Sequence, residues 1–308
     1  MEWQQIVGFQ HVARLGSFTR AAEATFRTQS ALSQQIKALE QELGCMLFER
    51  IGKRKIRLTP AGEKFLSFSA EILEKYDLFL GSLSGLKGVP QGPLRIAAPF
   101  TTLYHLCPAI FSEYANRFPQ VQLTILDRPQ KRAIELVRNG EVDFALALES
   151  LVPQDLNFLR WKQVETVLIV PPGHPLLAEV PITLEMIARY PLILPPKTAE
   201  HVNRLRVEER LQKLGVRYHV IMESSNVELS SVYVEMGLGI SFATVVRELP
   251  FPTERRVEFL PLTHYFEPDH LAVIRGRSKA LPPYKEALVS MLLQSQPNTE
   301  VAAVQGTD

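Results

Sequence analysis

Residues 28–44 read TQSALSQQIKALEQELG, and this stretch decides the fold of the amino-terminal part of the chain. Its apolar residues are spaced by four, three and four positions: Leu32, Ile36, Leu39 and Leu43. Residues with this spacing fall on one narrow stripe of an α-helix, so the helix has one face to bury. Because glycine commonly ends a helix, the pattern predicts a helix over residues 29–43 that stops at Gly44.

The opposite face of this helix carries side chains that form hydrogen bonds: Ser30, Gln34, Lys37 and Gln41. An α-helix fits the major groove of B-DNA, where the base edges present donors and acceptors. Since a recognition helix makes its base contacts near its start, Gln29 and Ser33 are added to the predicted DNA-reading face. An ordinary solvated helix face has the same polarity, so polarity alone leaves both interpretations open.

The segments on both sides of this helix predict a small helical head followed by a hairpin. Residues 6–13 have helical spacing, and a second helix is expected from Arg20 to about Phe26 with Thr19 as its cap. Residues 48–57 (FERIGKRKIR) alternate like a short hairpin with a basic tip. Five cations are expected to hold DNA phosphates: Lys37, Arg50, Lys53, Arg54 and Lys55.

The charge distribution agrees with a head that touches nucleic acid. Residues 1–58 contain nine Lys and Arg against five Asp and Glu, a net charge of +4. The whole chain is at +1, so the remainder is at −3. A basic head on an acidic body is typical of a protein that contacts nucleic acid through one domain. On charge alone, a chance asymmetry is the alternative.

A long helix is expected from Pro60 to about Lys87, because proline favours the first turn of a helix and no other proline interrupts the stretch. Apolar side chains repeat in it every seven residues, with two more at the offset-four positions: Phe65, Ile72, Phe79 and Leu86, then Tyr76 and Leu83. This is the seam of a short coiled coil, and it predicts a homodimer. A helix packed on its own domain is the alternative.

Residues 88–93 (GVPQGP) are rich in glycine and proline, which interrupt regular secondary structure. After them the pattern alternates between strands and helices. Strands are expected at 94–98, 121–126, 143–148, 167–170, 192–194, 218–222 and 240–244. Helices are expected at 103–117, 132–139, 199–214 and 227–235. This alternation predicts an α/β fold with a mainly parallel sheet, long enough for two lobes.

Several blocks of the sequence resemble the LysR-type transcriptional regulators. In the head they are residues 18–22 (FTRAA), 28–36 (TQSALSQQI), 39–40 (LE), 43–44 (LG), 47–50 (LFER) and 58–62 (LTPAG). Residues 174–176 (HPL) and 237–241 (GLGIS) look like the effector domain of the same family. The resemblance implies a regulator of transcription that binds double-stranded DNA as a dimer or tetramer, with contact to RNA polymerase as one route of action.

The resemblance also implies the architecture. We expect an α/β effector domain of two Rossmann-like lobes, similar to periplasmic binding proteins, preceded by an all-α winged helix-turn-helix and a long linker helix. The expected parts are the helix-turn-helix at 1–58, the linker helix at 59–88, a hinge at 89–93, lobe 1 at 94–162 with 268–300, lobe 2 at 163–267 and a flexible tail at 301–308.

Within the family, residues 226–239 are most similar to the branch that regulates sulfur assimilation. That branch tends to carry a Thr-Thr pair after the first strand of the effector domain, and Thr101 and Thr102 match the pair. The polar block that usually follows is missing, since residues 103–105 (LYH) are not polar in the same way.

Polar residues follow the predicted strands at the edge where open α/β folds bind ligands. Thr101 and Thr102 begin a helix, whose free N–H groups favour anions. Lys197 and Thr198 hold the matching position in the second lobe, and Asn226 follows a further strand. We predict that these five residues bind a small anionic effector, that Lys197 gives the preference for charge, and that no other cofactor is needed. The alternative is that Thr101 and Thr198 merely cap helices.

Other chemistry is not indicated. The sequence shows no Gly-rich phosphate loop, Gly-x-Ser-x-Gly elbow or His-Glu-x-x-His, so no enzyme is expected. Four residues of metal-ligand type lack a recognised spacing and are expected in a solvated loop: His264, Glu267, Asp269 and His270. Cys45 and Cys107 fall in different predicted domains, so they are not expected to form a redox pair.

Two rival functions follow from the body alone. One is a solute-binding protein of periplasmic type, and the other is an enzyme that works between the lobes. The basic head argues against the first, as does the absence of a secretory signal at the start of the sequence. No apolar stretch approaches the ~20 residues of a membrane span, so no membrane partner and a cytoplasmic location are expected. The second rival lacks a convincing nucleophile–base set.

Overall fold

The structure is a computed structural model of the chain, and it describes all residues except 52–54, 87–89, 199–200, 247–254, 277–280 and 296–308. The chain divides into two compact units, and the division falls between Val89 and Pro90. No helix of the described residues is long and apolar enough to cross a membrane.

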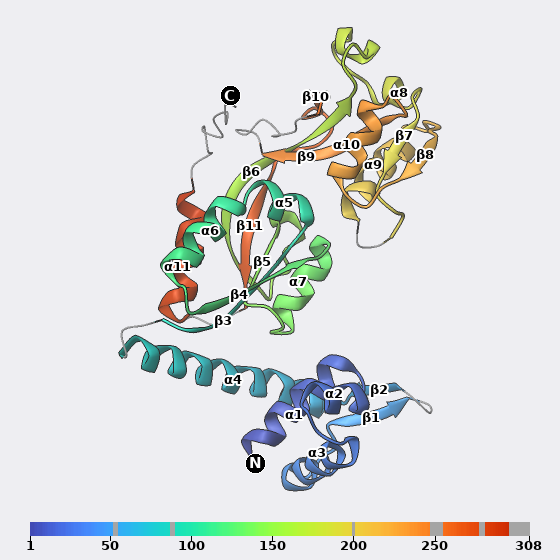
Figure 1. The fold of residues 1–308 in the computed structure, drawn as a ribbon. Coiled ribbons are helices and arrows are strands. Elements are labelled where there is room, and N and C mark those ends of the chain that lie inside the picture. The colour runs from blue at the N-terminus through green and yellow to red at the C-terminus, as the bar shows by residue number, and fades with distance from the viewer. Residues whose placement is uncertain (52–54, 87–89, 199–200, 247–254, 277–280, 296–308) are drawn as a thin grey trace. The chain divides into compact units, whose positions relative to one another are not determined.

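The amino-terminal unit consists of three short helices, a hairpin and a long helix (Figure 1). The elements are α1 (Trp3–Leu15), α2 (Phe18–Ala24), α3 (Gln29–Leu43), β1 (Phe48–Ile51), β2 (Lys55–Leu58) and α4 (Pro60–Leu86). Each was predicted from the sequence. The cap of α2 was predicted wrongly, because Ser17 and not Thr19 accepts the N–H of Arg20 at its start.

The core of this unit forms around Phe9 of α1. Its ring lies 5.1 Å from the ring of Phe48 and 4.8 Å, edge-on, from that of Phe65. Helix α1 approaches α3 closely at Gly8, where an added Cβ would lie 2.7 Å from the Cδ1 atom of Leu32. The shape of the head therefore depends on a small residue on α1 and a ring at its centre.

Helix α4 is anchored on the head through its first turns. Phe65 is buried in the core of the head, and the Gln10 amide donates to the Ser69 hydroxyl at 2.7 Å. The prediction that Phe65 belongs to a dimer seam is therefore wrong, because the seam pattern begins inside the head. Further along α4, Tyr76, Phe79 and Leu83 are exposed in the single chain.

The carboxy-terminal unit contains one mixed sheet, which the described strands form in the order β4-β3-β5-β11-β6-β9-β7-β8, with β10 paired to β6. Its strands are β3 (Gly92–Ala98), β4 (Val121–Asp127), β5 (Phe144–Leu148), β6 (Asn157–Val170), β7 (Leu192–Leu194), β8 (Val220–Glu223), β9 (Ile240–Val246), β10 (Glu258–Pro261) and β11 (Asp269–Arg275). The prediction of a mainly parallel sheet is wrong: β6 pairs antiparallel with β9, β10 and β11.

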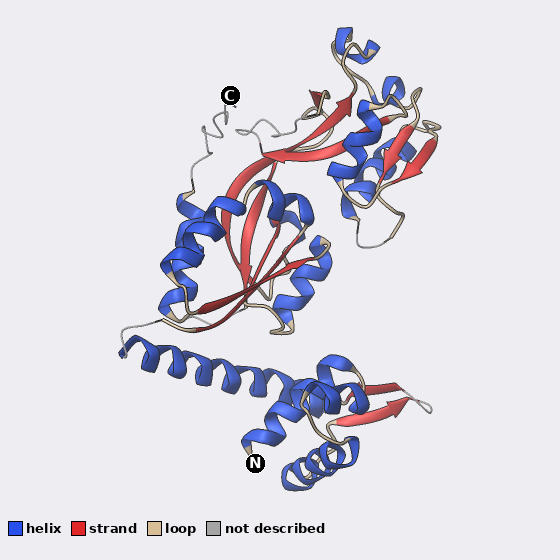
Figure 2. Ribbon diagram, viewed as in Figure 1, coloured by secondary structure: helices blue, strands red, loops and turns tan. Residues whose placement is uncertain are grey.

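The helices of this unit cover both faces of the sheet (Figure 2). They are α5 (Phe100–His105), α6 (Pro108–Arg117), α7 (Gln130–Arg138), α8 (Leu184–Ile187), α9 (Val202–Lys213), α10 (Val227–Glu235) and α11 (Pro283–Gln294), with 3-10 turns at Glu149–Leu151 and Pro175–Ala178. In the first lobe, α6 and α11 lie on one face of the sheet and α7 on the other (Figure 1). The Tyr114 hydroxyl of α6 donates to the Tyr284 carbonyl of α11 at 2.8 Å, which ties the two helices together.

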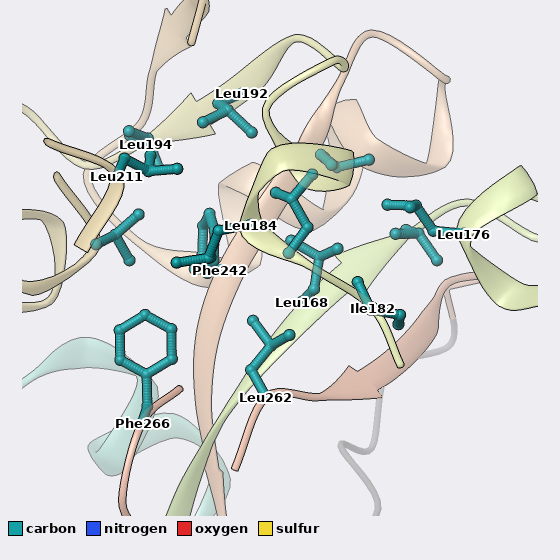
Figure 3. Packing of buried hydrophobic residues seen from close by; sticks show 14 residues of the cluster. Leu168, Leu176, Ile182, Leu184, Leu192, Leu194, Leu211, Phe242, Leu262 and Phe266 are labelled. Atoms are coloured by element: carbon teal, nitrogen blue, oxygen red, sulfur yellow. The ribbon is translucent and has the colours of Figure 1, made fainter. Parts of the chain in front are cut away.

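The second lobe has its own hydrophobic core (Figure 3). Side chains from strands β6, β7 and β9 meet those of α8 and α9 there: Leu168, Leu192, Leu194, Phe242, Leu184 and Leu211. The predicted lobe boundary at 162/163 falls inside β6, which continues from one lobe into the other. The predicted hinge at 89–93 overlaps β3, whose Gly92 and Pro93 already pair with β4.

Several elements differ from the sequence prediction. The expected helix 103–117 is broken at Leu106–Cys107, because Pro108 begins a new helix and has no N–H to continue the previous one. Strands β10 and β11 and helix α11 were not predicted. Asp269 and His270, expected in a solvated loop, begin β11.

Candidate nucleic-acid interface and effector site

Helix α3 is capped at both ends by neighbouring residues of the chain, Thr28 and Gly44. The Thr28 hydroxyl accepts the N–H of Ala31 at 3.2 Å, which satisfies one of the free donors of the first turn. At the other end Gly44 has φ +67, a left-handed conformation that glycine adopts without strain. These two caps fix the helix over the range that the sequence predicted.

The two faces of α3 separate as predicted, with one exception. Leu32, Ile36 and Leu39 are buried in the head. The predicted reading residues lie at the surface, Ser33 half-buried and the others exposed: Gln29, Ser30, Gln34 and Lys37. Leu43 was expected in the buried stripe but is 40% exposed, because the chain turns away after it at Gly44.

Glu40 takes the buried place near the end of α3, and sequence reasoning missed it. One of its carboxylate oxygens accepts the N–H of Leu47 at 2.7 Å and that of Phe48 at 3.2 Å. The carboxylate therefore joins the end of α3 to the beginning of β1. Leu39-Glu40 and residues 47–48 belong to the blocks that resemble the LysR-type regulators, and these bonds give that resemblance a physical reason.

The hairpin places its basic residues along two short strands. In β1 and β2, Arg50 lies opposite Ile56 and Lys55 opposite Ile51. Lys53 and Arg54, predicted at the tip, lie outside the described residues. Arg57, which is not among the predicted phosphate contacts, donates from its guanidinium to the Glu49 carboxylate at 2.7 Å.

In the first lobe, the two predicted effector-binding threonines lie in the first turn of α5. Pro99 is the N-cap residue of this helix, and Thr102 is buried while Thr101 is half-buried. Thr101 is therefore not the cap that the alternative interpretation expected. Thr198 does not cap α9 either, since His201 holds that position.

Lys197 belongs to a charge network in the second lobe. Its ammonium lies 3.3 Å from the Glu208 carboxylate, which also receives the guanidinium of buried Arg204 at 2.9 Å. Burial alone would raise the pKa of Glu208, but hydrogen bonds from Arg204, Tyr218 and Lys197 outweigh burial and hold the pKa below its ordinary value. The Lys197 charge is thus already balanced, although its side chain is 61% exposed.

Asn226 has a clear local role as the cap of α10. Its side-chain oxygen accepts the N–H of Leu229 at 2.9 Å, and its backbone carbonyl accepts the Ser230 hydroxyl at 3.0 Å. The loop before it is tied to the end of β7, since the Ser224 N–H donates to the Leu194 carbonyl at 2.9 Å. The loops after β7 and β8 are therefore neighbours.

The structure connects the two lobes through residues that the sequence analysis did not single out. His105 at the end of α5 is hydrogen-bonded to Glu228 in the first turn of α10. This contact brings the helix that carries Thr101 and Thr102 next to the helix that Asn226 caps. On α9, Arg206 donates to the Ser150 hydroxyl of the first lobe at 2.6 Å.

A small pocket lies beside α9, lined by seven residues: Thr166, Asn203, Arg206, Val207, Phe242, Ala243 and Phe266. None of the predicted effector residues lines it. Arg206, which lines it, also lies 3.9 Å from the Asp269 carboxylate.

The remaining candidates do not form sites among the described residues. No group of three or more His, Cys, Asp or Glu is placed to hold a metal ion in that part of the chain. Cys45 lies at the surface of the head, whereas Cys107 is buried in the other unit, where burial raises the pKa of its thiol to about 12. A buried thiol of this kind is unreactive at neutral pH.

Two family profiles match the chain. Residues 3–63 match the bacterial regulatory helix-turn-helix protein of the lysR family, and residues 87–297 match the LysR substrate binding domain. The regulator CysB of Burkholderia cenocepacia is 30% identical over 90% of this chain and 88% of its own length. Other relatives are the regulator Cbl of Escherichia coli, 31% identical over 78% of this chain and 76% of its own length, and the regulator SsuR of Burkholderia cenocepacia, 26% identical over 99% of this chain and 98% of its own length.

Solved structures show the same fold. A full-length OxyR from Pseudomonas aeruginosa is similar with a TM-score of 0.66 and 24% identity, covering 95% of this chain and 96% of that one. CbnR, solved in complex with its target DNA, is similar with a TM-score of 0.53 and 20% identity, covering 95% of this chain and 99% of that one.

Proposed function

This chain belongs to the LysR family of bacterial transcriptional regulators, and we propose that α3 reads its target DNA while a small anion bound to the effector domain controls that binding. The family consists of regulators with a helix-turn-helix and an effector-binding domain, not of enzymes. The rival interpretations as a solute-binding protein or an enzyme are thereby set aside.

The DNA contacts are proposed from the exposed face of α3. Gln29, Ser30, Ser33 and Gln34 carry the donors and acceptors that read base edges, and Lys37 with the basic hairpin holds phosphates. The observation that carries this proposal is the separation of α3 into a buried apolar face and an exposed polar face between two caps.

A DNA shift assay at several salt concentrations tests the proposal. The intact protein is titrated against random duplex, and against a duplex that it selects from a random library. We expect binding to both, with higher affinity for the selected duplex and a steep fall with salt, because phosphate contacts release counterions. Lack of affinity for any duplex at low ionic strength would overturn the proposal.

The effector is proposed to be a small anion that binds where α5, the Lys197–Thr198 loop and α10 come together, with no further cofactor. The contact between His105 and Glu228 supports this place, since it brings Thr101 and Thr102 near the helix that Asn226 caps. Thermal-shift measurements with sulfate, phosphate and acetate test it, because a ligand of the folded form raises the melting temperature. The variant Thr102→Val should abolish any shift that the native protein shows.

The regulatory mechanism is proposed as a shift between two arrangements of a homodimer or homotetramer. An effector changes their populations only if it binds them with different affinity. The exposed side chains Tyr76, Phe79 and Leu83 of α4 support self-association. Leu83→Glu should lower the sedimentation coefficient of the intact protein. Contact with RNA polymerase and a cytoplasmic location are further parts of the proposal that follow from regulating transcription.

A further inference from the structure

The turn between α2 and α3 presents an aromatic ring to solvent. The Phe26 side chain is 97% exposed, and no other large apolar residue of the described head is exposed to that degree. A ring in this position exposes apolar surface to water without any packing in return, which is unfavourable for the isolated protein.

The backbone at Phe26 is unusual as well. Its φ is +54, the only positive value found at a non-glycine residue among the described residues. A bulky side chain rarely adopts this conformation, because its Cβ crowds the backbone. Strained positions of this kind are concentrated at functional sites.

The turn is held firmly by backbone hydrogen bonds. The Phe26 N–H donates to the Glu23 carbonyl at 3.1 Å, and the Arg27 N–H donates to the Ala22 carbonyl at 2.8 Å. The Arg27 guanidinium is bound to the Gln35 side chain of α3 at 2.5 Å. These hydrogen bonds hold the backbone of the turn in the free protein, with the Phe26 side chain exposed to solvent.

The position of the turn between α2 and α3 indicates what the Phe26 ring contacts. Phe26 lies two residues before Thr28, the cap of α3. The first two residues of the helix, Gln29 and Ser30, are exposed and follow Thr28 directly. In a helix-turn-helix, the amino-terminal end of the recognition helix enters the major groove. Whatever projects from the turn at that end lies beside the duplex. The C5-methyl group of thymine is the apolar group that the major groove offers, and phenylalanine is suited to contact it.

We propose that Phe26 is a DNA-contacting residue that packs on the C5-methyl group of a thymine next to the base pairs read by Gln29 and Ser30. This inference rests on the proposed function of α3. It adds an apolar contact to a face whose other members are polar or basic, and so a preference for thymine at one position of the site.

The test compares Phe26→Asn with Met46→Gln in the intact protein. Asparagine tolerates a positive φ, so the first variant should fold with an unchanged or higher melting temperature. Met46 is an exposed apolar residue beyond the other end of α3, and its variant is the matched control. Affinity for the selected duplex is measured by fluorescence anisotropy over a range of potassium chloride concentrations.

We expect Phe26→Asn to weaken binding by about 5–10-fold at every salt concentration, and Met46→Gln to leave it unchanged. The slope of affinity against salt should stay at the native value, because an apolar contact releases no counterions. An unchanged affinity of Phe26→Asn overturns the inference. A reduced salt slope, or a changed sedimentation coefficient, would assign the ring to a phosphate-linked or protein contact and overturns it as well.

A modified duplex tests the thymine contact directly. Thymines of the selected site are replaced one at a time by deoxyuridine, which lacks only the methyl group. At one position the native protein should lose affinity by about fivefold while Phe26→Asn loses none. If every replacement affects both proteins equally, the methyl contact is refuted. Failure of the proposed function is distinguishable, since the native protein would then bind no duplex.

Discussion

The Nε2 atom of His105, the last residue of α5, donates a hydrogen bond to the carboxylate of Glu228 in the first turn of α10. The two residues are 123 positions apart and belong to different lobes of the effector domain. His105 is nearly buried and Glu228 is mostly buried. Since α5 and α10 carry or adjoin three of the proposed effector residues, this bond joins the lobes beside the proposed site.

A double-mutant cycle should measure this connection. We expect His105→Gln and Glu228→Gln to be coupled by roughly 1 kcal/mol in the free energy of unfolding, because a hydrogen bond to a charged, largely buried group is worth more than an exposed pair. Unfolding is followed by the fluorescence of Trp161 in a Trp3→Phe background, because this substitution removes the tryptophan of the head and leaves only that of the effector domain. Strictly additive effects of the two substitutions would contradict the prediction.

Two substitutions on α3 should affect DNA binding in different ways. Lys37→Ala should weaken binding to all duplexes and reduce the salt slope by about 1, since it removes a phosphate contact. Gln34→Ala should cost about 1–3 kcal/mol on the selected duplex and little on random duplex. Lys213→Ala, which removes an exposed cation from the second lobe, is the control. Equal losses on both duplexes for Gln34→Ala would show that Gln34 does not read bases.

The head was predicted well because its signals are local. The helix of residues 29–43 begins and ends at Thr28 and Gly44, which act on the backbone next to them. Leu43 was placed wrongly because periodicity considers only the helix and not the direction of the chain after it. Glu40 was missed because its partners, the N–H groups of Leu47 and Phe48, are brought to it by the turn at Gly44.

The effector domain was predicted less completely because its decisive pairings are distant in sequence. Strand β6 extends over Asn157–Val170, but only Val167–Val170 were predicted, since the first part mixes apolar and polar side chains and lacks a continuous apolar run. Strand β11 returns late in the chain to pair antiparallel with β5 and β6. The bond between His105 and Glu228 joins residues 123 positions apart and has no sequence signature.

The Glu40 carboxylate should be important for the stability of the head. Glu40→Ala removes the acceptor of two buried N–H groups, those of Leu47 and Phe48, so we expect a loss of about 2–3 kcal/mol in the free energy of unfolding. Glu40→Gln keeps an oxygen acceptor and should lose less than half as much. Thermal unfolding of both variants, followed by circular dichroism, checks this order. Equal losses would contradict the prediction, because glutamine keeps both the volume and an acceptor oxygen, so only the negative charge of Glu40 would then matter.

The buried thiol of Cys107 should make the effector domain sensitive to alkaline pH. Burial raises the pKa of this thiol from 9.0 to about 12 in the folded protein, while the unfolded chain keeps the ordinary value. A group whose pKa is raised on folding stabilises the folded state fully below the unfolded pKa, and this contribution is lost as pH rises toward the folded pKa. Between about pH 9 and 12 the group therefore lowers the free energy of unfolding by up to ~1.4 kcal/mol per pH unit.

Tyr114 acts in the same direction, because burial raises the pKa of its hydroxyl as well, but its ordinary value of 10.0 delays its effect. From pH 9 to 10 the thiol therefore contributes more to the loss of stability than Tyr114 does. We expect urea unfolding of Cys107→Ala, compared with the native protein, to show a smaller loss of stability across that interval, since alanine has no proton to lose. All other titrating groups are shared by the two proteins and cancel in the difference. If both lose stability equally between pH 9 and 10, the thiol is not protected by burial in the folded state.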